Sequence, residues 1–178
     1  MSRFCDDYCE EWWPNQGLLW QANLQRALGG KRGQAALREM KEALQALPKK
    51  RIIAGAMCTV DVEKRKTEKS ADPHGWYASD LECLVRDEGE GVCALGAFLW
   101  YKKVKEGADP QSAFDELPTL LGTEGEGDLR TAELGRDAGL TFTLAWHLAY
   151  RNDQDYEGMT PEERYESFMD WLDKQLVP

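Results

Sequence analysis

Cys93 is the residue of this sequence whose position most favours nucleophilic chemistry. It follows a glycine-containing turn at 88–91 and opens the run Cys93-Ala-Leu-Gly-Ala97, which is typical of a helix start. A thiol at a helix N-terminus lies at the positive end of the helix dipole, which lowers the thiol pKa and favours the reactive thiolate. A thiol enzyme that uses Cys93 is therefore one hypothesis for the function.

The sequence offers few groups that could act as a base for Cys93. Its two histidines are His74, in a polar segment, and His147, within an apolar helix. Asp153 is a further candidate partner for the thiol. A free cysteine is also one of the residue types most often buried as a small apolar group. Because Cys93 with His147 or Asp153 makes an incomplete catalytic set, we favour a non-enzymatic function.

A metal site is the second kind of chemistry that the cysteines could support. Cys5 and Cys9 are separated by three residues, which places both thiols on one face if this segment is helical. A structural zinc site needs four ligands. The second pair would have to come from Cys58, Cys83 and His74, whose spacing does not require them to converge. We therefore expect neither a metal nor another cofactor.

Two segments partly match motifs that bind phosphate or DNA. Gly29–Gly33 is glycine-rich and basic but lacks the full phosphate-loop pattern, and it is more typical of a turn that joins two helices as an antiparallel hairpin. Residues 131–151 resemble a helix-turn-helix, with Gly135 and Gly139 where small residues are wanted, yet the second helix presents Phe142 and Trp146 where a recognition helix needs polar or basic residues. A DNA-binding regulator is kept as an alternative, although we do not expect direct contact with nucleic acid.

The net charge of −10 is distributed unevenly along the chain. Residues 1–89 hold 14 acidic and 14 basic residues, whereas residues 90–178 hold 18 acidic and 8 basic ones. Residues 31–70 alone carry a net charge of +6. The sequence therefore predicts a polarised molecule with an acidic C-terminal half.

An acidic C-terminal half favours a basic partner. A negatively charged surface can occupy the nucleic-acid channel of a basic protein through electrostatic complementarity. We therefore predict a non-enzymatic interaction protein that binds or inhibits a basic protein, such as one that binds nucleic acid. The candidate binding residues are Glu124, Glu126, Asp128, Asp153, Asp155 and Glu157. The alternative is that these acidic residues are solvated charges that keep the chain soluble.

Composition points to a cytoplasmic location. The five cysteines are odd in number, which does not suit a secreted disulfide framework. The sequence has no run of about 18 apolar residues that could cross a membrane. Its first residues are rich in acids where a signal peptide needs basic residues followed by an apolar run.

Hydrophobic spacing and helix-end residues predict a mainly α (α+β) fold. We expect one domain over 1–178, built as a bundle of about six or seven helices with a small element of two or three strands. The strands are expected within 51–60 and 81–85, and residues 61–80 should form a flexible flap. Thr160-Pro161 and Glu163 form a capping box, which makes the last helix the clearest of the set. The expected helices cover 15–28, 33–47, 92–105, 110–117, 129–138, 141–150 and 160–176.

Three stretches together resemble an uncharacterised family of small bacteriophage and actinobacterial proteins. They are Cys93-Ala-Leu-Gly-Ala97, the pair Asn152-Asp153 at the end of a later helix, and Thr160-Pro-Glu-Glu-Arg-Tyr165. The resemblance covers the last half of the chain and residues near 51–58. The family brings no activity with it, but the resemblance implies a phage-encoded protein that works in a bacterial cytoplasm. In that setting we expect the predicted basic partner to be a bacterial host or defence protein, which would give this chain an anti-defence role.

Overall fold

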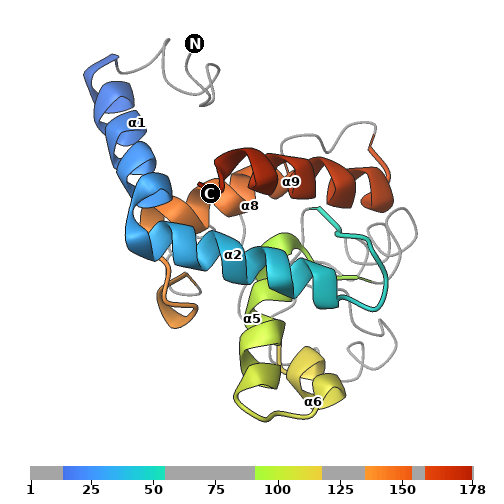
Figure 1. Ribbon diagram of the computed structural model, residues 1–178. Coiled ribbons are helices and arrows are strands. Elements are labelled where there is room, and N and C mark those ends of the chain that lie inside the picture. Colours follow the sequence, from blue (N-terminus) through green and yellow to red (C-terminus); the bar gives the residue numbers. More distant parts are fainter. Residues whose placement is uncertain (1–13, 55–90, 118–134, 154–158, 178) are drawn as a thin grey trace, which may run out of the picture.

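The computed structural model describes residues 14–54, 91–117, 135–153 and 159–177, and the mainly helical class is confirmed in these ranges (Figure 1). A short helical segment at 135–137 precedes α8. The predicted flap at 61–80 lies outside the described residues. The six helices are α1 (Pro14–Gly29), α2 (Lys31–Ala46), α5 (Ala94–Lys105), α6 (Pro110–Asp115), α8 (Phe142–Asp153) and α9 (Pro161–Gln175).

The first two helices meet in an elbow, so the antiparallel hairpin that their sequence suggests is wrong. Only Gly30 separates α1 from α2, and α2 leaves at a steep angle (Figure 1). One linking residue is too few to reverse the chain direction. A Cβ atom on Gly33 would lie 1.6 Å from the carbonyl oxygen of Ala27, which shows how closely the two helices approach at the elbow. Glycine is therefore required at position 33.

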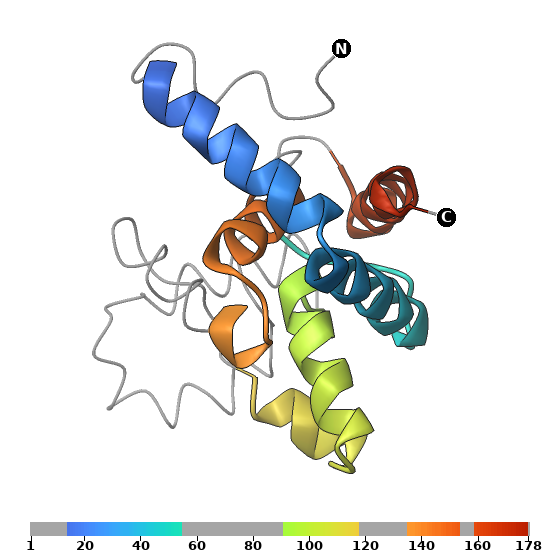
Figure 2. The same ribbon diagram turned by 60° about the vertical axis from the view of Figure 1, so that its left-hand side comes forward.

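The helices enclose one hydrophobic cluster. α2 packs against α5 and α9, while α8 lies behind α2 and contacts α1, α5 and α9 (Figures 1 and 2). Apolar residues recur every three or four positions along these helices, so each helix turns one side toward the cluster. Its largest fully buried side chains include Leu37, Met40 and Leu44 of α2, Leu95 and Phe98 of α5, Leu144 and Leu148 of α8, and Phe168 of α9.

The predicted β element is not supported by the described residues. Residues 51–54 form no regular secondary structure, and Ile53 donates a backbone hydrogen bond to the carbonyl of Val92 (3.0 Å) without forming a strand with it. Residues 55–60 and 81–85, where most of the expected strand residues fall, lie outside the described ranges. Helices α8 and α9 supply the other hydrogen-bond partners of residues 52 and 53.

The predicted cap of α9 is confirmed. Thr160 Oγ1 accepts a hydrogen bond from the Glu163 amide (3.2 Å), and the Glu163 carboxylate accepts one from the Thr160 amide (2.9 Å). This second bond holds the pKa of Glu163 below its ordinary value. Asp109 caps α6 in the same way, since its carboxylate accepts from the amides of Gln111 and Ser112. Both helices therefore begin where the local sequence predicts.

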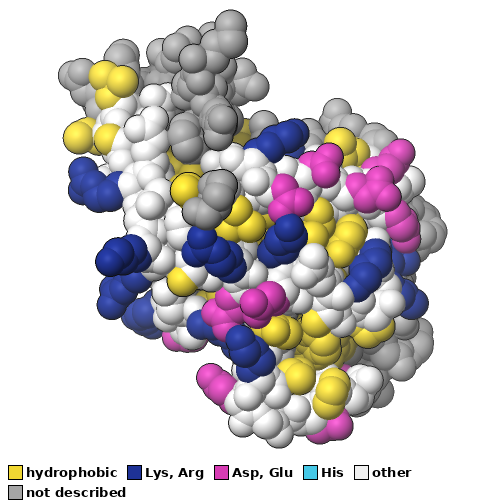
Figure 3. Space-filling view, in the orientation of Figure 1, with side chains coloured by type: hydrophobic (Ala, Val, Ile, Leu, Met, Phe, Trp, Pro, Cys, Tyr) yellow, Lys and Arg dark blue, Asp and Glu magenta, His cyan; other side chains and the backbone are white. Residues whose placement is uncertain are grey.

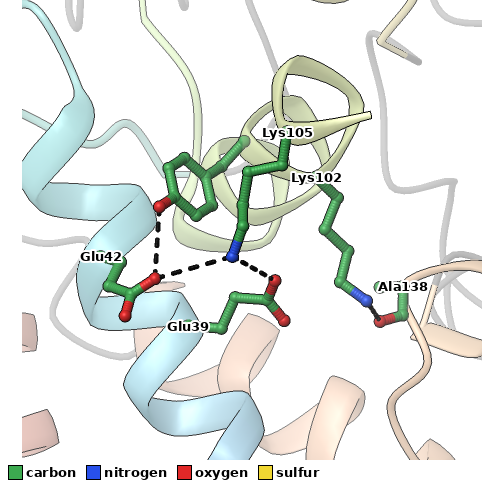
Figure 4. Close-up of polar contacts among 6 residues, drawn as sticks. Glu39, Glu42, Lys102, Lys105 and Ala138 are labelled. Carbon is green, nitrogen blue, oxygen red and sulfur yellow. Dashed lines mark hydrogen bonds and ion pairs between the residues drawn. The ribbon is translucent and has the colours of Figure 1, made fainter. Parts of the chain in front are cut away.

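A seam of polar contacts joins α5 to its neighbours (Figure 4). Lys105 pairs with Glu39 (3.3 Å) and Glu42 (3.8 Å) of α2, and its hydrogen bond to Glu39 is the main reason that its pKa is raised. One turn earlier, Lys102 donates to the carbonyl of Ala138, in the turn that leads to α8. The hydroxyl of Tyr101 also donates to Glu42 (3.2 Å). These contacts fix α5 against α2 on one side and the 135–140 turn on the other.

Aromatic side chains tie α1 to α8. Trp20 makes edge-to-face contacts with Trp146 and Phe142, with ring centroids 5.2 and 6.3 Å apart, and Trp146 stacks on Tyr150 at 5.3 Å. Trp20 is thus docked against the body of the protein, in line with its large apolar area. No helix in the described part of the chain is long and apolar enough to cross a bilayer.

Candidate functional site

Residues 52 and 53 form a buried junction where four parts of the chain meet. The amide of Ile52 donates to the carbonyl of Pro161 (3.1 Å), and the amide of Ile53 donates to that of Val92 (3.0 Å). Their carbonyls accept from Arg164 (3.1 Å) and Asn152 (2.7 Å), respectively. Both isoleucines are fully buried. Every backbone polar group of Ile52 and Ile53 is therefore satisfied without a β-sheet, as burial demands.

Asn152 is the central residue of this junction. Its side-chain oxygen accepts from the amide of Ala94 (2.9 Å) at the start of α5, while its Nδ2 donates to Ile53 and to the Asp153 carboxylate. The side chain is only 2% exposed. Asn152 follows Leu148 and Leu144 at helical spacing, so its place on the buried face of α8 could have been recognised from the sequence. The side-chain amide of Asn152 thus joins α8, the start of α5 and residues 52–53.

Arg164 is a buried cation that sequence reasoning missed. Its guanidinium donates to the carbonyls of Ile52 (3.1 Å) and Met159 (3.2 Å), and the residue is 2% exposed. The spacing from Arg164 to Phe168 and Leu172 puts it on the buried side of α9, which was the available indication.

Cys93, the candidate nucleophile, lies beside the junction but is enclosed. It is the N-cap of α5, and its sulfur accepts a hydrogen bond from the amide of Gly96 (3.3 Å). The residue is 1% exposed. The predicted position at a helix N-terminus is therefore confirmed, and the thiol faces the protein interior. In this arrangement the sulfur caps the helix.

His147, the candidate base, is turned toward a different helix. It is 6% exposed, and its ring lies against Trp171 of α9, with centroids 5.6 Å apart. Asn152, which contacts the start of α5, is five positions later and so lies on a different side of α8. No hydrogen bond joins His147 to Cys93. Burial, together with the charge of Arg151, lowers the pKa of His147 from 6.5 to about 4.

Most of the acidic candidates cannot be placed. Asp153 lies at the end of α8, where its carboxylate accepts from Nδ2 of Asn152 (2.8 Å). The other five candidates, and the cysteines and histidine considered for a metal, lie outside the described residues. Within the described ranges no group of three or more potential metal ligands occurs. The candidates that lie outside the described residues are Glu124, Glu126, Asp128, Asp155, Glu157, Cys5, Cys9, Cys58, Cys83 and His74.

In the segment that resembles a helix-turn-helix, the described residues 135–151 comprise a short helical stretch at 135–137, a turn and most of α8, and they pack tightly. A Cβ atom on Gly135 would lie 2.3 Å from that of Ala145, and Gly139 adopts a positive φ of 76° in the turn. Its second helix, α8, is covered by α1, α5 and α9. A DNA-recognition helix must project from the protein surface into the major groove. The position of α8 therefore does not favour the DNA-binding alternative.

A surface pocket of about 350 Å³ opens at the elbow between α1 and α2. Arg26, from the last turns of α1, and Arg32, from the first turn of α2, line it on one side. Thr141 and Thr143, around the start of α8, line it on the other. Gly29–Gly33, the partial phosphate-loop match, spans the connection of the two helices: Gly29 ends α1, Gly30 is the link and residues 31–33 begin α2. Gly30 and Gly33 also line the pocket.

The described part of the chain therefore contains two distinct features. One is a buried junction centred on Asn152, and the other is an open, basic pocket at the elbow. The junction brings together the three stretches singled out in the sequence, at 93–97, 152–153 and 160–165, around residues 52 and 53. Comparison with protein-family models, with curated proteins and with solved structures finds no match to this chain.

Proposed function

We propose that this chain is a non-enzymatic interaction protein whose acidic segments bind a basic protein. The supporting observation is the way in which the charge divides. Residues 1–89 are balanced, with 14 acidic and 14 basic residues, whereas residues 90–178 hold 18 acidic and 8 basic ones. The excess falls in particular segments of that half, residues 118–134 and 154–158 among them, which together hold six acidic residues and one basic one.

Two of those segments carry the candidate residues. Residues 118–134 include Glu124, Glu126 and Asp128, and residues 154–158 include Asp155 and Glu157. Closely spaced like charges attract an oppositely charged partner over a distance of about 10 Å at 0.1 M salt. We propose that the partner is a bacterial host or defence protein with a basic nucleic-acid channel, and that the encounter takes place in a bacterial cytoplasm. The phage setting follows from the sequence resemblance.

The arrangement of Cys93 and His147 also supports a binding function. A thiol catalyst needs an accessible sulfur and a base within hydrogen-bond reach of it. Here the sulfur is enclosed and caps α5, while the imidazole lies against Trp171. The thiol enzyme stays a hypothesis with its own test. If Cys93 reacted with a maleimide in the native protein as fast as a free thiol does, the non-enzymatic proposal would lose this support.

Affinity capture with two matched variants tests the proposal. The first replaces Glu124, Glu126 and Asp128 with their amides, and the second makes the same change at the exposed positions Glu106, Glu166 and Asp170. We expect the unmodified chain and the second variant to capture one dominant basic protein from a bacterial lysate. The first variant should lose it.

Salt completes this test. The captured protein should dissociate at about 0.5 M salt, where charges at the surface are strongly screened. If both variants keep the partner, or if salt has no effect, then the acidic segment is not the binding element. A captured protein that is itself acidic would also contradict the proposal.

A further inference from the structure

The elbow pocket combines a ligand-sized volume with an excess of positive charge. Its volume of about 350 Å³ lies in the range of pockets that hold small molecules. Arg26 and Arg32 line it, and no Asp or Glu does. Figure 3 shows Lys and Arg side chains gathered over α1 and the start of α2, on the side where the two helices meet. The exposed Lys31 adds a third cation to this elbow.

The cations of the elbow lack the carboxylate partners that three lysines elsewhere in the described residues have. Lys41 pairs with Asp173, Lys103 with Glu116, and Lys105 with Glu39. Arg26, Lys31 and Arg32 make no ion pair with any residue that the structure describes. Three neighbouring cations repel one another, so their accumulation beside a pocket lowers the free energy of binding for an anion.

Packing accounts for the glycines of the elbow but not for its arginines. A Cβ atom on Gly33 would collide with the carbonyl of Ala27, and one on Gly30 would lie 2.9 Å from that of Arg26. Both glycines are thus needed for the helices to meet. The guanidinium groups are exposed, so their type is not set by the core. Core packing therefore does not explain why two arginines line the pocket.

The remaining lining residues suit a ligand with a polar and an apolar part. Thr141, Thr143 and Asn23 present groups that can hydrogen-bond, whereas Leu140 and Leu144 provide apolar surface. The 16-residue helix α2 also begins here, and its N-cap Gly30 has no side chain to satisfy the first amides. Those amides add donors for an anion. They supplement the arginines.

We propose that the elbow pocket binds an organic phosphate, with Arg26 and Arg32 holding the phosphoryl group. The planar guanidinium matches two phosphate oxygens at once, which a solvated lysine does not. The threonine and asparagine side chains complete the polar side, and the leucines contact the organic part. None of the residues that line this pocket belongs to the acidic segments named above, so the two proposals fail or succeed separately.

Calorimetry and NMR titration of the full chain with four probes test this site. The probes are adenosine diphosphate, adenosine, inorganic phosphate and a short single-stranded oligonucleotide, each at up to millimolar concentration. We expect adenosine diphosphate to bind at least about tenfold more tightly than inorganic phosphate or adenosine. Of these three probes, only adenosine diphosphate carries both a phosphate group and an organic part. The amide resonances of Arg32, Gly33 and Thr143 should shift.

Two variants localise the binding. The double variant R26Q/R32Q should weaken binding of adenosine diphosphate by about tenfold or more, because it removes both charge-assisted contacts. The control K49Q/K103Q changes the net charge equally and should retain binding. All four positions are exposed or partly exposed, so circular dichroism should show unchanged helix content. Equal weakening in both variants would mean a diffuse charge effect and would overturn the proposal.

Three other outcomes would also overturn the proposal that the elbow pocket binds an organic phosphate. One is no binding of adenosine diphosphate at millimolar concentration. The second is equal binding of adenosine diphosphate and inorganic phosphate, which would leave no role for the apolar side of the pocket. The third is tighter binding of the oligonucleotide, which would assign this surface to nucleic acid.

Discussion

At the scale of single residues, buried polar side chains do the most to define this protein. Asn152 and Arg164 are each 2% exposed, and together they satisfy the carbonyls of Ile52 and Ile53. A buried hydrogen bond contributes modestly when made, but losing one partner leaves the other group unsatisfied at a cost of about 1–3 kcal/mol. Substitutions at these positions should therefore cost more than their small contact areas suggest.

Asn152→Ala should lower the free energy of unfolding by about 3 kcal/mol. The substitution leaves the amide of Ala94 and the carbonyl of Ile53 buried without their partner. Urea denaturation followed by circular dichroism measures the change. Gln45→Ala, which removes an exposed amide from α2, should change stability by less than about 0.5 kcal/mol. Similar effects of the two substitutions would show that Asn152 does not hold the junction.

His147 should make the protein less stable as the pH falls. Its pKa is lowered to about 4 in the folded chain, whereas an unfolded histidine titrates near 6.5. The unfolded state therefore binds more protons between these values, and stability is lost as the pH falls from about 6.5 to 4. The full effect is about 3 kcal/mol, and it is complete below pH 4.

Denaturation at pH 7, 5.5 and 4.5 measures this effect in the original chain and in His147→Phe. The variant lacks the imidazole, so it should lose less stability over this range. Carboxylates affect both proteins alike, and Glu163 and Asp109, whose pKa values are lowered, contribute mainly at the acidic end of the range. Identical pH profiles would mean that His147 is not buried in its neutral form.

At the scale of helices, the elbow decides how α1 is placed. Gly30 is the sole link between α1 and α2, and Gly33 lets the first turn of α2 approach the end of α1. Gln34 secures this approach, since its amide group donates to the carbonyls of Leu28 (2.8 Å) and Gln175 (3.0 Å). The elbow thus connects α1, α2 and the end of α9.

Gly33→Ala should destabilise the protein by about 3 kcal/mol, because the added methyl would lie 1.6 Å from the carbonyl oxygen of Ala27 and the helices would have to separate. Gly29→Ala is the matched control. Nothing lies within 4 Å of a Cβ atom at Gly29, so the change should be neutral or slightly stabilising. Thermal melts of both variants measure the difference. Equal melting temperatures would contradict the close approach at the elbow.

At the scale of the whole molecule, the junction at residues 52–53 links segments that are distant in sequence. The bonds from Asn152 to Ile53 and from Arg164 to Ile52 span 99 and 112 residues. Contacts of this separation form late in folding and break only when much of the structure opens. The junction should therefore belong to the most stable part of the protein.

Native-state hydrogen exchange tests this expectation. The amides of Ile52, Ile53 and Ala94 should exchange only through global unfolding, because each donates to a distant partner within the core. The amide of Gly107, in an exposed turn after α5, should exchange much faster although it also donates a hydrogen bond. Exchange of the three junction amides through a low-energy opening would show that the junction opens separately from the core.

The sequence alone determined the features that depend on neighbouring residues. The capping box of Thr160 and Glu163 and the Asp109-Pro110 start set the beginnings of α9 and α6, because a cap is satisfied within one helical turn. Helical spacing of apolar residues likewise predicted the six helices to within about three residues at most ends. The position of Cys93 at the start of α5 was predicted for the same local reason.

Only the tertiary structure decided how these elements meet and what the polar residues do. The elbow at Gly30 replaced the expected hairpin, and Cys93 and His147 were separated because they face different neighbours. Residues 52 and 53 found their hydrogen-bond partners on α8, on α9 and at Val92. The physical reason for this last arrangement is that a buried backbone group must be satisfied, and the partners of the two carbonyls lie far along the chain, at Asn152 and Arg164. Local sequence patterns carry no record of such a partner.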